Sequence, residues 1–279
     1  MCEFCTKHGE GKAWYLNANN YSNDLLNDAR RRKFVTKHFY WIDDAYKNYY
    51  GLLKSMPLHI PLVRKTIMAI VKKIYLYKHW GQVIPIEDVE KILDITNSVT
   101  RIPCGCRMAT TKKENRVCFL VSFDPRKLGL ADIVDKSYFG GPDTAKFEQV
   151  TKEWTLDFMR DGETRGMIHT VWAFEAPFVG GICNCDIASG CVPMMMYKNA
   201  VPVMFRSEYV AIVDEDRCIG CKKCIEVCQF SAIREESKDK VAVDVGRCYG
   251  CGICRVVCGK KALSLVDRAK QKNVSDLWY

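Results

Sequence analysis

The sequence predicts an α+β protein in three consecutive parts: a helical N-terminal segment, a cysteine-rich α/β module and a C-terminal domain built on a repeat. Helical periodicity dominates residues 1–98, and short apolar strands flanked by cysteines fill residues 99–205. Residues 206–279 hold two cysteine runs of identical spacing. Because helical and strand-like stretches are segregated along the chain, a mixed α+β fold is favoured.

The composition is that of an ordinary folded protein except for its cysteines. Hydrophobic residues make up 48% of the chain and charged residues 27%, values typical of globular domains. The start, Met1 to Cys5, lacks the basic and apolar regions of a signal peptide, and the chain holds 16 cysteines. We therefore expect a cytoplasmic protein whose cysteines bind metal rather than form disulfides.

The N-terminal part is expected to be mostly helical. Asp24 to Phe39 and Ile42 to Lys54 have helical periodicity, and Pro85 suits the start of a helix over Ile86 to Thr96. Leu62 to Trp80 is the most apolar helix candidate, but its lysines exclude a transmembrane span. Packing of its apolar face into the core is favoured over contact with a partner or a membrane surface.

Charge adds one candidate binding feature. The net charge is +9, and the densest basic run is Arg30 to Lys33. Such a run can contact nucleic acid or an acidic partner. A solvated helix face is the favoured interpretation, so no nucleic-acid partner is expected.

The first residues contain half of a possible metal site. Cys2, Cys5 and His8 follow the spacing C-x2-C-x2-H. Three such residues do not complete a four-coordinate site. Free thiols on a loose terminus are the alternative.

The middle part is predicted to be a compact α/β module that holds a metal site. Val117 to Phe123 and Met167 to Phe174 have the character of buried strands, and Ala145 to Met159 that of a helix. Six cysteines lie near the ends of these elements: Cys104, Cys106, Cys118, Cys183, Cys185 and Cys191. Because thiolates held close together need a cation, four or more of them are expected to bind a third [4Fe-4S] cluster or a zinc ion.

Other candidate ligands in the module have simpler interpretations. His169 lies in an apolar strand, where a hydrogen-bonded core histidine is favoured over a ligand. Met194 to Met196 is expected to fill core gaps. No G-x-G-x-x-G or Walker A pattern occurs, so the sequence offers no case for a flavin, nicotinamide or ATP site.

The C-terminal part carries the most specific motif of the chain. Each cysteine run has the spacing C-x2-C-x2-C-x3-C, and in bacterial iron–sulfur runs of this kind the fourth cysteine ligates the other cluster. The spacing therefore predicts two [4Fe-4S] clusters, held by Cys218, Cys221, Cys224 and Cys258, and by Cys248, Cys251, Cys254 and Cys228. Structural zinc is the alternative, but it usually takes two CxxC pairs held well apart.

The residues around the runs complete a repeat. Short apolar stretches at Tyr209 to Val213 and Ala262 to Val266 enclose the two runs, and a hairpin is expected between them, with its turn at Glu235 to Lys240. The region resembles the bacterial 2[4Fe-4S] ferredoxin family, which implies a pseudo-twofold fold and one-electron transfer. The family usually has proline after each fourth cysteine, where this chain has Gln229 and Gly259.

A weaker resemblance covers the middle part. The motifs Pro103 to Arg107, Gly166 to His169 and Ile182 to Cys185, with Cys118, resemble a cysteine-rich domain. That domain precedes ferredoxin modules in uncharacterised iron–sulfur proteins of anaerobes. The resemblance implies a two-cluster ferredoxin-like domain that follows a helical segment and a cysteine-rich α/β module.

Together these features favour an iron–sulfur electron-transfer protein, a subunit or partner of an anaerobic oxidoreductase. Its partner is expected to be a redox protein with an acidic face, docking on basic residues beside the clusters: Lys222, Lys223, Arg247, Arg255, Lys260 and Lys261. The alternative is a reductase that acts at an N-terminal cluster or at a thiol such as Cys106 or Cys185. A metal sensor or nucleic-acid-binding protein is the third class.

Overall fold

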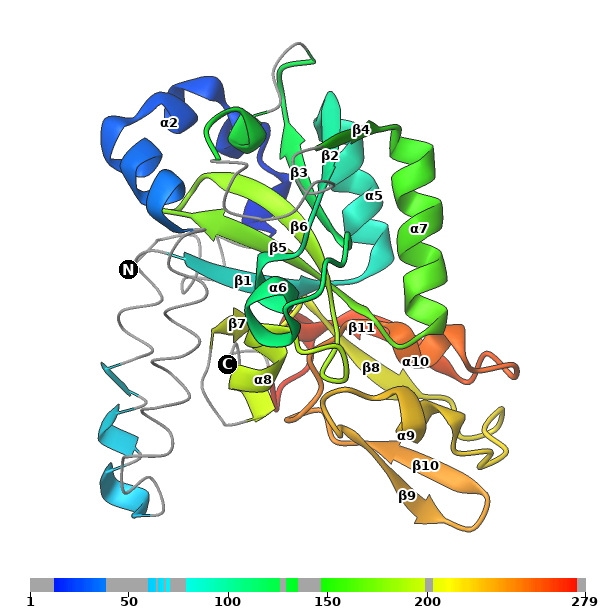
Figure 1. The fold of residues 1–279 in the computed structure, drawn as a ribbon. Coiled ribbons are helices and arrows are strands. Elements are labelled where there is room, and N and C mark those ends of the chain that lie inside the picture. Colours follow the sequence, from blue (N-terminus) through cyan, green and yellow to red (C-terminus); the bar gives the residue numbers. More distant parts are fainter. Residues whose placement is uncertain are drawn as a thin grey trace.

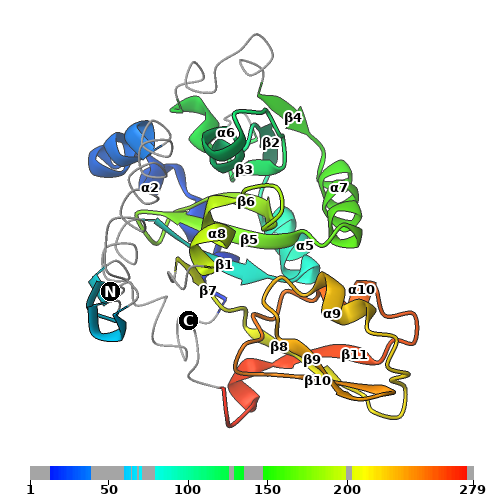
Figure 2. The same ribbon diagram turned by 60° about the horizontal axis from the view of Figure 1, so that its bottom comes forward.

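The computed structural model describes residues 13–38, 60–63, 65–67, 69–70, 79–125, 129–134, 147–198 and 203–274. A twisted sheet lies at the centre of the molecule, helices cover both of its faces, and the C-terminal domain packs beside it (Figures 1 and 2). Helices and strands are mixed and the N-terminal segment is helical, so the predicted α+β class is confirmed.

The central sheet has seven strands in the order β4-β2-β3-β6-β5-β1-β7. Neighbouring strands are antiparallel, except that β1 and β7 are parallel. The predicted strands at 117–123 and 167–174 are confirmed as β3 and β5. The strands are β1 (His79–Ile84), β2 (Ser98–Ile102), β3 (Cys118–Ser122), β4 (Glu148–Val150), β5 (Ile168–Phe174), β6 (Val179–Cys185) and β7 (Met204–Phe205).

The two faces of the sheet pack against different partners, because side chains alternate along a strand. Phe119 belongs to a core shared with α5 (Ile86–Ile95) and α7 (Lys152–Thr164). Its neighbours Cys118 and Leu120 belong to a second core on the opposite face. One face of the sheet is therefore covered by two long helices, and the other carries cysteines.

The cysteine-bearing face is covered by α6 (Gly105–Thr111), α8 (Val192–Lys198) and the C-terminal domain (Figure 2). Met194 and Met196 are buried in this core, as predicted. The same hydrophobic cluster continues into the C-terminal domain without interruption.

The C-terminal domain is the predicted repeat of strand, loop, helix and strand. β8 pairs with β11, and β9 forms with β10 the predicted hairpin. The elements are β8 (Tyr209–Val213), α9 (Lys223–Val227), β9 (Ile233–Ser237), β10 (Lys240–Val243), α10 (Ile253–Val256) and β11 (Leu263–Asp267).

The N-terminal segment differs from prediction in one respect. The helix expected from Asp24 to Phe39 is divided at Asp28, whose carboxylate accepts a hydrogen bond from the Arg31 N–H at 2.8 Å and so begins a new helical stretch over 29–38. The predicted helix Ile42 to Lys54 lies outside the described residues. The other elements are η1 (Trp14–Leu16), η2 (Ala18–Tyr21), α2 (Asn23–Asn27), η3 (Gly129–Asp132) and η5 (Arg268–Lys270).

The apolar candidate Leu62 to Trp80 is corrected in two ways. Residues 61–63, 65–67 and 69–70 are helical, but His79 and Trp80 begin β1. Leu62 is 74% exposed and Ile70 is 56% exposed, so the expected packing of these two side chains into the core is wrong.

Two further elements depart from the predicted boundaries. Residues 79–84 were assigned to the helical N-terminal part, yet they form β1, which pairs with β5 over its whole length, so the sheet extends across residue 98. The helix predicted from Ala145 starts only at Lys152, because Thr151 caps it by accepting the Trp154 N–H at 3.1 Å. β4 precedes the helix, and Arg101 and Arg116 pair with its Glu148.

One residue of the basic run is part of the core of the fold, while Arg30, Arg32 and Lys33 are exposed as expected of a solvated helix face. Arg31 is buried, and its guanidinium donates to the backbone carbonyls of Leu25, Phe174 and Glu175. Neither the nucleic-acid contact nor the solvated helix face holds for this residue. Arg31 instead ties the N-terminal segment to the end of β5.

In the part of the chain that is described, no helix is long and apolar enough to cross a bilayer.

Replacement of Arg31 by methionine should destabilise the fold, because it leaves buried carbonyls without donors. We expect a loss of about 2–4 kcal/mol in the free energy of unfolding, measured by urea denaturation. Arg32→Met is the matched control, since Arg32 is exposed and its guanidinium donates to the exposed Asn27 side chain at 3.4 Å. Equal stability of the two variants would contradict the assigned role.

Candidate metal centres

The first four-cysteine set lines one cavity. Cys218, Cys221, Cys224 and Cys258 surround a space of about 270 Å³. The first three come from the loop before α9 and from its first turn, and Cys258 arrives from beyond α10. The fourth cysteine of the second run thus joins the first three of the first run.

Glycine makes the loop of this set possible. Gly220 has a φ of +63°, and a Cβ there would lie 2.4 Å from the backbone of Asp239. Only glycine fits such a conformation and such an approach. The loop can therefore close around the cavity while β9 and β10 lie against it.

The second set gathers around Cys228. The thiols of Cys248, Cys251 and Cys254 each interact electrostatically with Cys228, which follows α9. The Cys248 sulfur accepts the N–H groups of Ala211 and Gly250, both at 3.4 Å. Backbone donors of this kind favour the thiolate form that binds iron.

The fourth cysteines are held in the same way. The Cys228 sulfur accepts the Ala232 N–H at 3.3 Å, and the Cys258 sulfur accepts the Ala262 N–H at 3.3 Å. These equivalent bonds reflect the internal repeat. Each fourth cysteine is fixed by the residue four positions later and faces the set of the other run.

Burial makes these thiols reluctant to ionise on their own. It raises the pKa of Cys224 to about 11 and raises the pKa values of Cys248, Cys251 and Cys254 above their ordinary range. A thiol with a raised pKa becomes a thiolate at neutral pH only when a metal replaces its proton. The donor chemistry, the cavity and the N–H···S bonds of the two sets all fit iron–sulfur clusters.

The six cysteines of the middle part also come together. Register places Cys118 opposite Cys183 on neighbouring strands. Contacts with Cys106 and Cys118 lower the pKa of the Cys104 thiol well below its usual value. Contacts with Cys104 and Cys183 raise the pKa of Cys118. These four thiols form one continuous set.

Cys185 and Cys191 complete the group. Cys185 lies two residues after Cys183 on β6, hence on the same face, and the Thr170 hydroxyl contacts its sulfur at 3.5 Å. Burial and a contact with Cys185 raise the pKa of Cys191. We call the six residues the six-cysteine pocket, and Cys106 and Cys183 are its partly exposed members.

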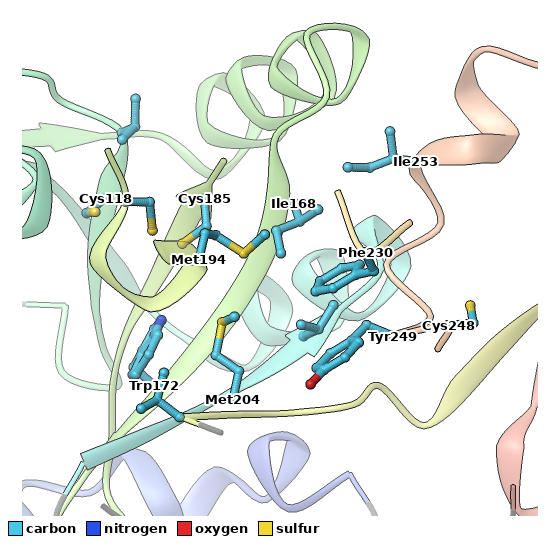
Figure 3. Packing of buried hydrophobic residues seen from close by; sticks show 14 of the residues in the cluster. Cys118, Ile168, Trp172, Cys185, Met194, Met204, Phe230, Cys248, Tyr249 and Ile253 are labelled. Atoms are coloured by element: carbon cyan, nitrogen blue, oxygen red, sulfur yellow. The ribbon is translucent and has the colours of Figure 1, made fainter. Parts of the chain in front are cut away.

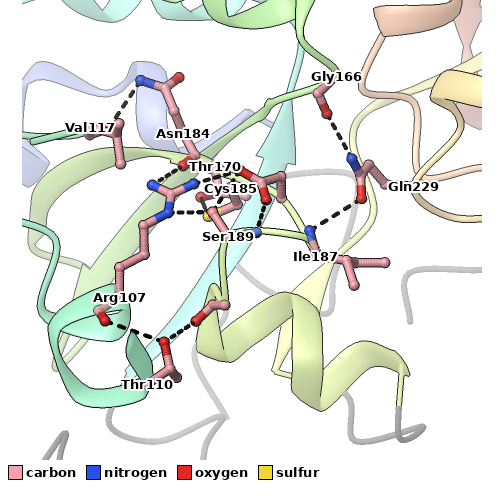
Figure 4. A network of polar contacts seen from close by, with 12 residues as sticks. Arg107, Thr110, Val117, Gly166, Thr170, Asn184, Cys185, Ile187, Ser189 and Gln229 are labelled. Carbon is pink, nitrogen blue, oxygen red and sulfur yellow. Dashed lines mark hydrogen bonds and ion pairs between the residues drawn. The ribbon is translucent and has the colours of Figure 1, made fainter. Parts of the chain in front are cut away.

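A buried arginine, Arg107, lies beside Cys185 (Figure 4). The Arg107 guanidinium donates to the Asp186 carboxylate at 2.7 Å and to the Asn184 carbonyl at 3.1 Å. Although burial disfavours its charge, nearby thiols led by Cys104 and Cys118 raise the pKa of Arg107 above its usual value. Arg107 therefore brings permanent positive charge to a group of potential thiolates.

The geometry does not favour a single-ion site. Among the described residues, no group of three or more His, Cys, Asp or Glu side chains is arranged to hold one metal ion. Cys2, Cys5 and His8 lie outside those residues. Every cysteine that is described is a free thiol.

His169 is the buried histidine that the sequence predicts. Its Nδ1 lies 2.6 Å from the Asn184 amide oxygen, and its Nε2 lies 3.7 Å from the Glu163 carboxylate. It projects from the face of β5 opposite to the cysteines, because its neighbour Ile168 belongs to the cysteine-bearing core.

Two residues of the site were not predicted. Arg107 directly follows the C-x-C motif, and this adjacency is the only signal that the sequence gives for it. Gln229 stands out as a departure from the ferredoxin pattern, but its hydrogen-bond partners lie 42 and 63 positions away. Long-range partners of this kind leave no local pattern.

Comparison with known proteins identifies the C-terminal domain. Residues 211–265 match the model of the 4Fe-4S dicluster domain. A component of the ion-translocating oxidoreductase complex from Haemophilus influenzae, strains PittEE and 86-028NP, is 39% identical over 70 residues. The match spans 20% of this chain and 36% of the length of each relative. No solved structure matches the chain. The matched domain supports a role in iron–sulfur electron transfer.

Substitution of Gly250 by alanine should disrupt the second set. Gly250 has a φ of +72°, and an added Cβ would lie 2.0 Å from the Tyr209 carbonyl oxygen. We expect loss of about four irons per chain, the content of one cluster, measured by iron and sulfide assay. Gly259→Ala is the control, because nothing lies within 4 Å of its added Cβ. Full cluster content in Gly250→Ala would show that the loop tolerates the strain.

Proposed function

We propose that the protein relays single electrons through two [4Fe-4S] clusters. Cys218, Cys221, Cys224 and Cys258 hold the first, and Cys248, Cys251, Cys254 and Cys228 hold the second. One observation carries this proposal: the fourth cysteine of each run lies with the first three cysteines of the other run. Eight thiols thereby form two groups of four within a 4Fe-4S dicluster domain.

The chain is further proposed to serve as a subunit or partner of an oxidoreductase. The relatives named above are components of an ion-translocating oxidoreductase complex. The match covers only a small part of this chain, so the N-terminal module would give it a different partner or a different position in such an assembly.

Electrons are proposed to enter at the first set. Cys221 is exposed, Ile219 beside it is 55% exposed, and Lys223 and Lys260 line the same cavity. An apolar centre flanked by lysines suits a redox partner with an acidic face. Two residues expected to dock a partner are paired within the chain: Lys222 with Glu235 at 2.7 Å, and Arg255 with Glu87 at 2.8 Å.

The six-cysteine pocket is proposed as a third metal centre, an iron–sulfur cluster in preference to the single zinc ion that the side-chain geometry does not favour. Its thiols contact one another, and the Arg107 guanidinium would offset part of the negative charge that bound thiolates carry. The reductase alternative also depends on this pocket. The observation that favours it is the partial exposure of Cys106 and Cys183, which would let a small substrate approach.

Metal content tests the proposal directly. Anaerobically purified full-length protein should contain about eight irons and eight sulfides from the two sets, with about four more of each if the pocket holds a cluster. Cys224→Ser and Cys248→Ser should each lose one cluster of the domain, and Cys185→Ser should affect only the third centre. Zinc without sulfide in the domain would refute the relay.

Charge reversal tests the docking face. Lys223→Glu combined with Lys260→Glu should slow reduction by an acidic flavodoxin by roughly two- to tenfold at low salt. The difference should shrink as salt rises, because exposed charges are screened beyond roughly 10 Å at 0.1 M. Lys113→Glu is the control, since Lys113 is exposed and lies after α6. Equal rates at all salt concentrations would rule out this face.

A further inference from the structure

We propose that the six-cysteine pocket receives its electrons from the second cysteine set, and that Gln229 is the positioning residue that fixes the two centres relative to each other. This inference rests on the proposed function, because it requires a redox-active centre in the pocket. It adds the order of the relay and the residue that maintains the connection.

Gln229 bridges two modules from the corner of the second set. It directly follows Cys228, and its side-chain oxygen accepts the Ile187 N–H at 3.2 Å (Figure 4). Its side-chain nitrogen donates to the Gly166 carbonyl at 3.0 Å. Ile187 belongs to the turn that connects Cys185 with Cys191, so one side chain joins a residue beside the second set to the loop between two pocket cysteines.

The equivalent position in the other repeat makes no such bridge. Gly259 follows Cys258 of the first set, and nothing lies within 4 Å of a Cβ built there. Proline, which the ferredoxin family usually has at both positions, would supply neither the donor nor the acceptor of Gln229. The internal symmetry of the domain is therefore broken on the side that faces the pocket.

Aromatic packing also joins the second set to the sheet module, and Figure 3 shows Phe230 and Tyr249 side by side near Cys248. Phe230 and Tyr249 stack with ring centroids 4.2 Å apart, and each lies within two positions of a cysteine of the second set. Tyr197 packs edge-on against both rings, at 5.0 Å and 5.2 Å. Tyr197 lies on α8, which begins directly after Cys191.

The two sets lie at opposite ends of β8. Tyr209, at the start of β8, approaches Gly250 in the loop of the second set, whereas Val213, at the end of the strand, lines the cavity of the first set. β8 therefore runs from the second set to the first, and the contacts to the sheet module described above start from Gln229, Phe230 and Tyr249, beside the second set. The order of the relay is partner, first set, second set, pocket.

Each step moves one electron. The cysteines of the two sets and of the pocket would hold the groups that carry the electron: a one-electron donor protein would supply it, and the group in the pocket would be its acceptor. The residues named here supply no atoms or protons to this exchange. Their role is to hold the second set and the pocket at a fixed separation through packed protein.

The experiment compares the full-length wild type with Gln229→Ala, Gln229→Pro and Gln229→Glu. The residue before position 229, Cys228, has a φ of −72° and a ψ of 95°, which is compatible with a following proline. After rapid mixing with reductant, freeze-quench EPR follows reduction of each centre, while iron and sulfide assays count the clusters.

We expect unchanged metal content and unchanged reduction of the two domain clusters in all three variants. Reduction of the pocket centre should be slower in Gln229→Ala and Gln229→Pro than in the wild type, because the two hydrogen bonds that hold the loop beside the second set are lost. Gln229→Glu keeps the acceptor for Ile187 and should fall between these variants and the wild type. Gly259→Ala is the matched control and should behave as the wild type.

Three results would overturn the inference. The first is equal rates for Gln229→Ala, Gly259→Ala and the wild type. The second is reduction of the pocket centre before the second cluster. The third is a pocket that holds zinc or no metal, which the metal assay reveals before any kinetics. Only an empty pocket also removes the third centre of the proposed function, so the two failures can be told apart.

Discussion

The alternation of side chains along the buried strands β3 and β6 is the constraint on which the rest of the structure depends. Cys118, Cys183 and Cys185 share one face because they occupy alternate positions of strands in fixed register. A shift of one residue would turn all three toward α5 and α7. The same alternation leaves the opposite face apolar, which keeps the helices there and the cysteines beside the C-terminal domain.

Gathering so many thiols in a low-dielectric interior has an electrostatic consequence. Each thiolate added to a buried group is disfavoured by burial and by its neighbours, as the raised pKa values of Cys118, Cys191 and Cys251 show. Within the pocket, Arg107 provides a fixed positive charge beside the thiols and is held there by its ion pair with Asp186. In the C-terminal domain, backbone N–H groups serve the same purpose, together with the positive charge of Arg268 near Cys248.

The sequence predicts best where local chemistry decides the conformation. The strand at Tyr209 to Val213 and the glycine loops follow from residues that lie next to one another, and the structure agrees with both. β1 was missed because His79 to Ile84 is a short apolar stretch at the end of a longer apolar window, and only pairing with β5 selects the strand. The start of α7 was misplaced because the apolar spacing continued across Thr151, where a side-chain cap sets the boundary.

The candidate site residues likewise divide into those that the local sequence reveals and those that only the folded chain reveals. The cysteines are visible as a repeated spacing, whereas Arg107 and Gln229 acquire their roles from partners that lie more than 40 positions away in sequence. For Arg31 the sequence led to a wrong prediction. Its place in a run of like charges indicated an exposed helix face, but its guanidinium is buried and donates to the Glu175 carbonyl. Tertiary contacts decided each of these cases.

The junction that Gln229 makes between the C-terminal domain and the sheet module also determines whether the domain could be exchanged for another. A free-standing ferredoxin grafted in place of residues 206–279 could supply the same eight cysteines with the same spacing. It would, however, have proline at position 229, which cannot make the two hydrogen bonds of Gln229 to the sheet module. The graft would keep its clusters, but it would not make the two hydrogen bonds that join the domain to the sheet module. The C-terminal domain is thus not an interchangeable part. Its two duplicated halves also tolerate substitution unequally after the fourth cysteine: a side chain added at Gly259 meets no atom within 4 Å, whereas a change at Gln229 alters the junction with the sheet module.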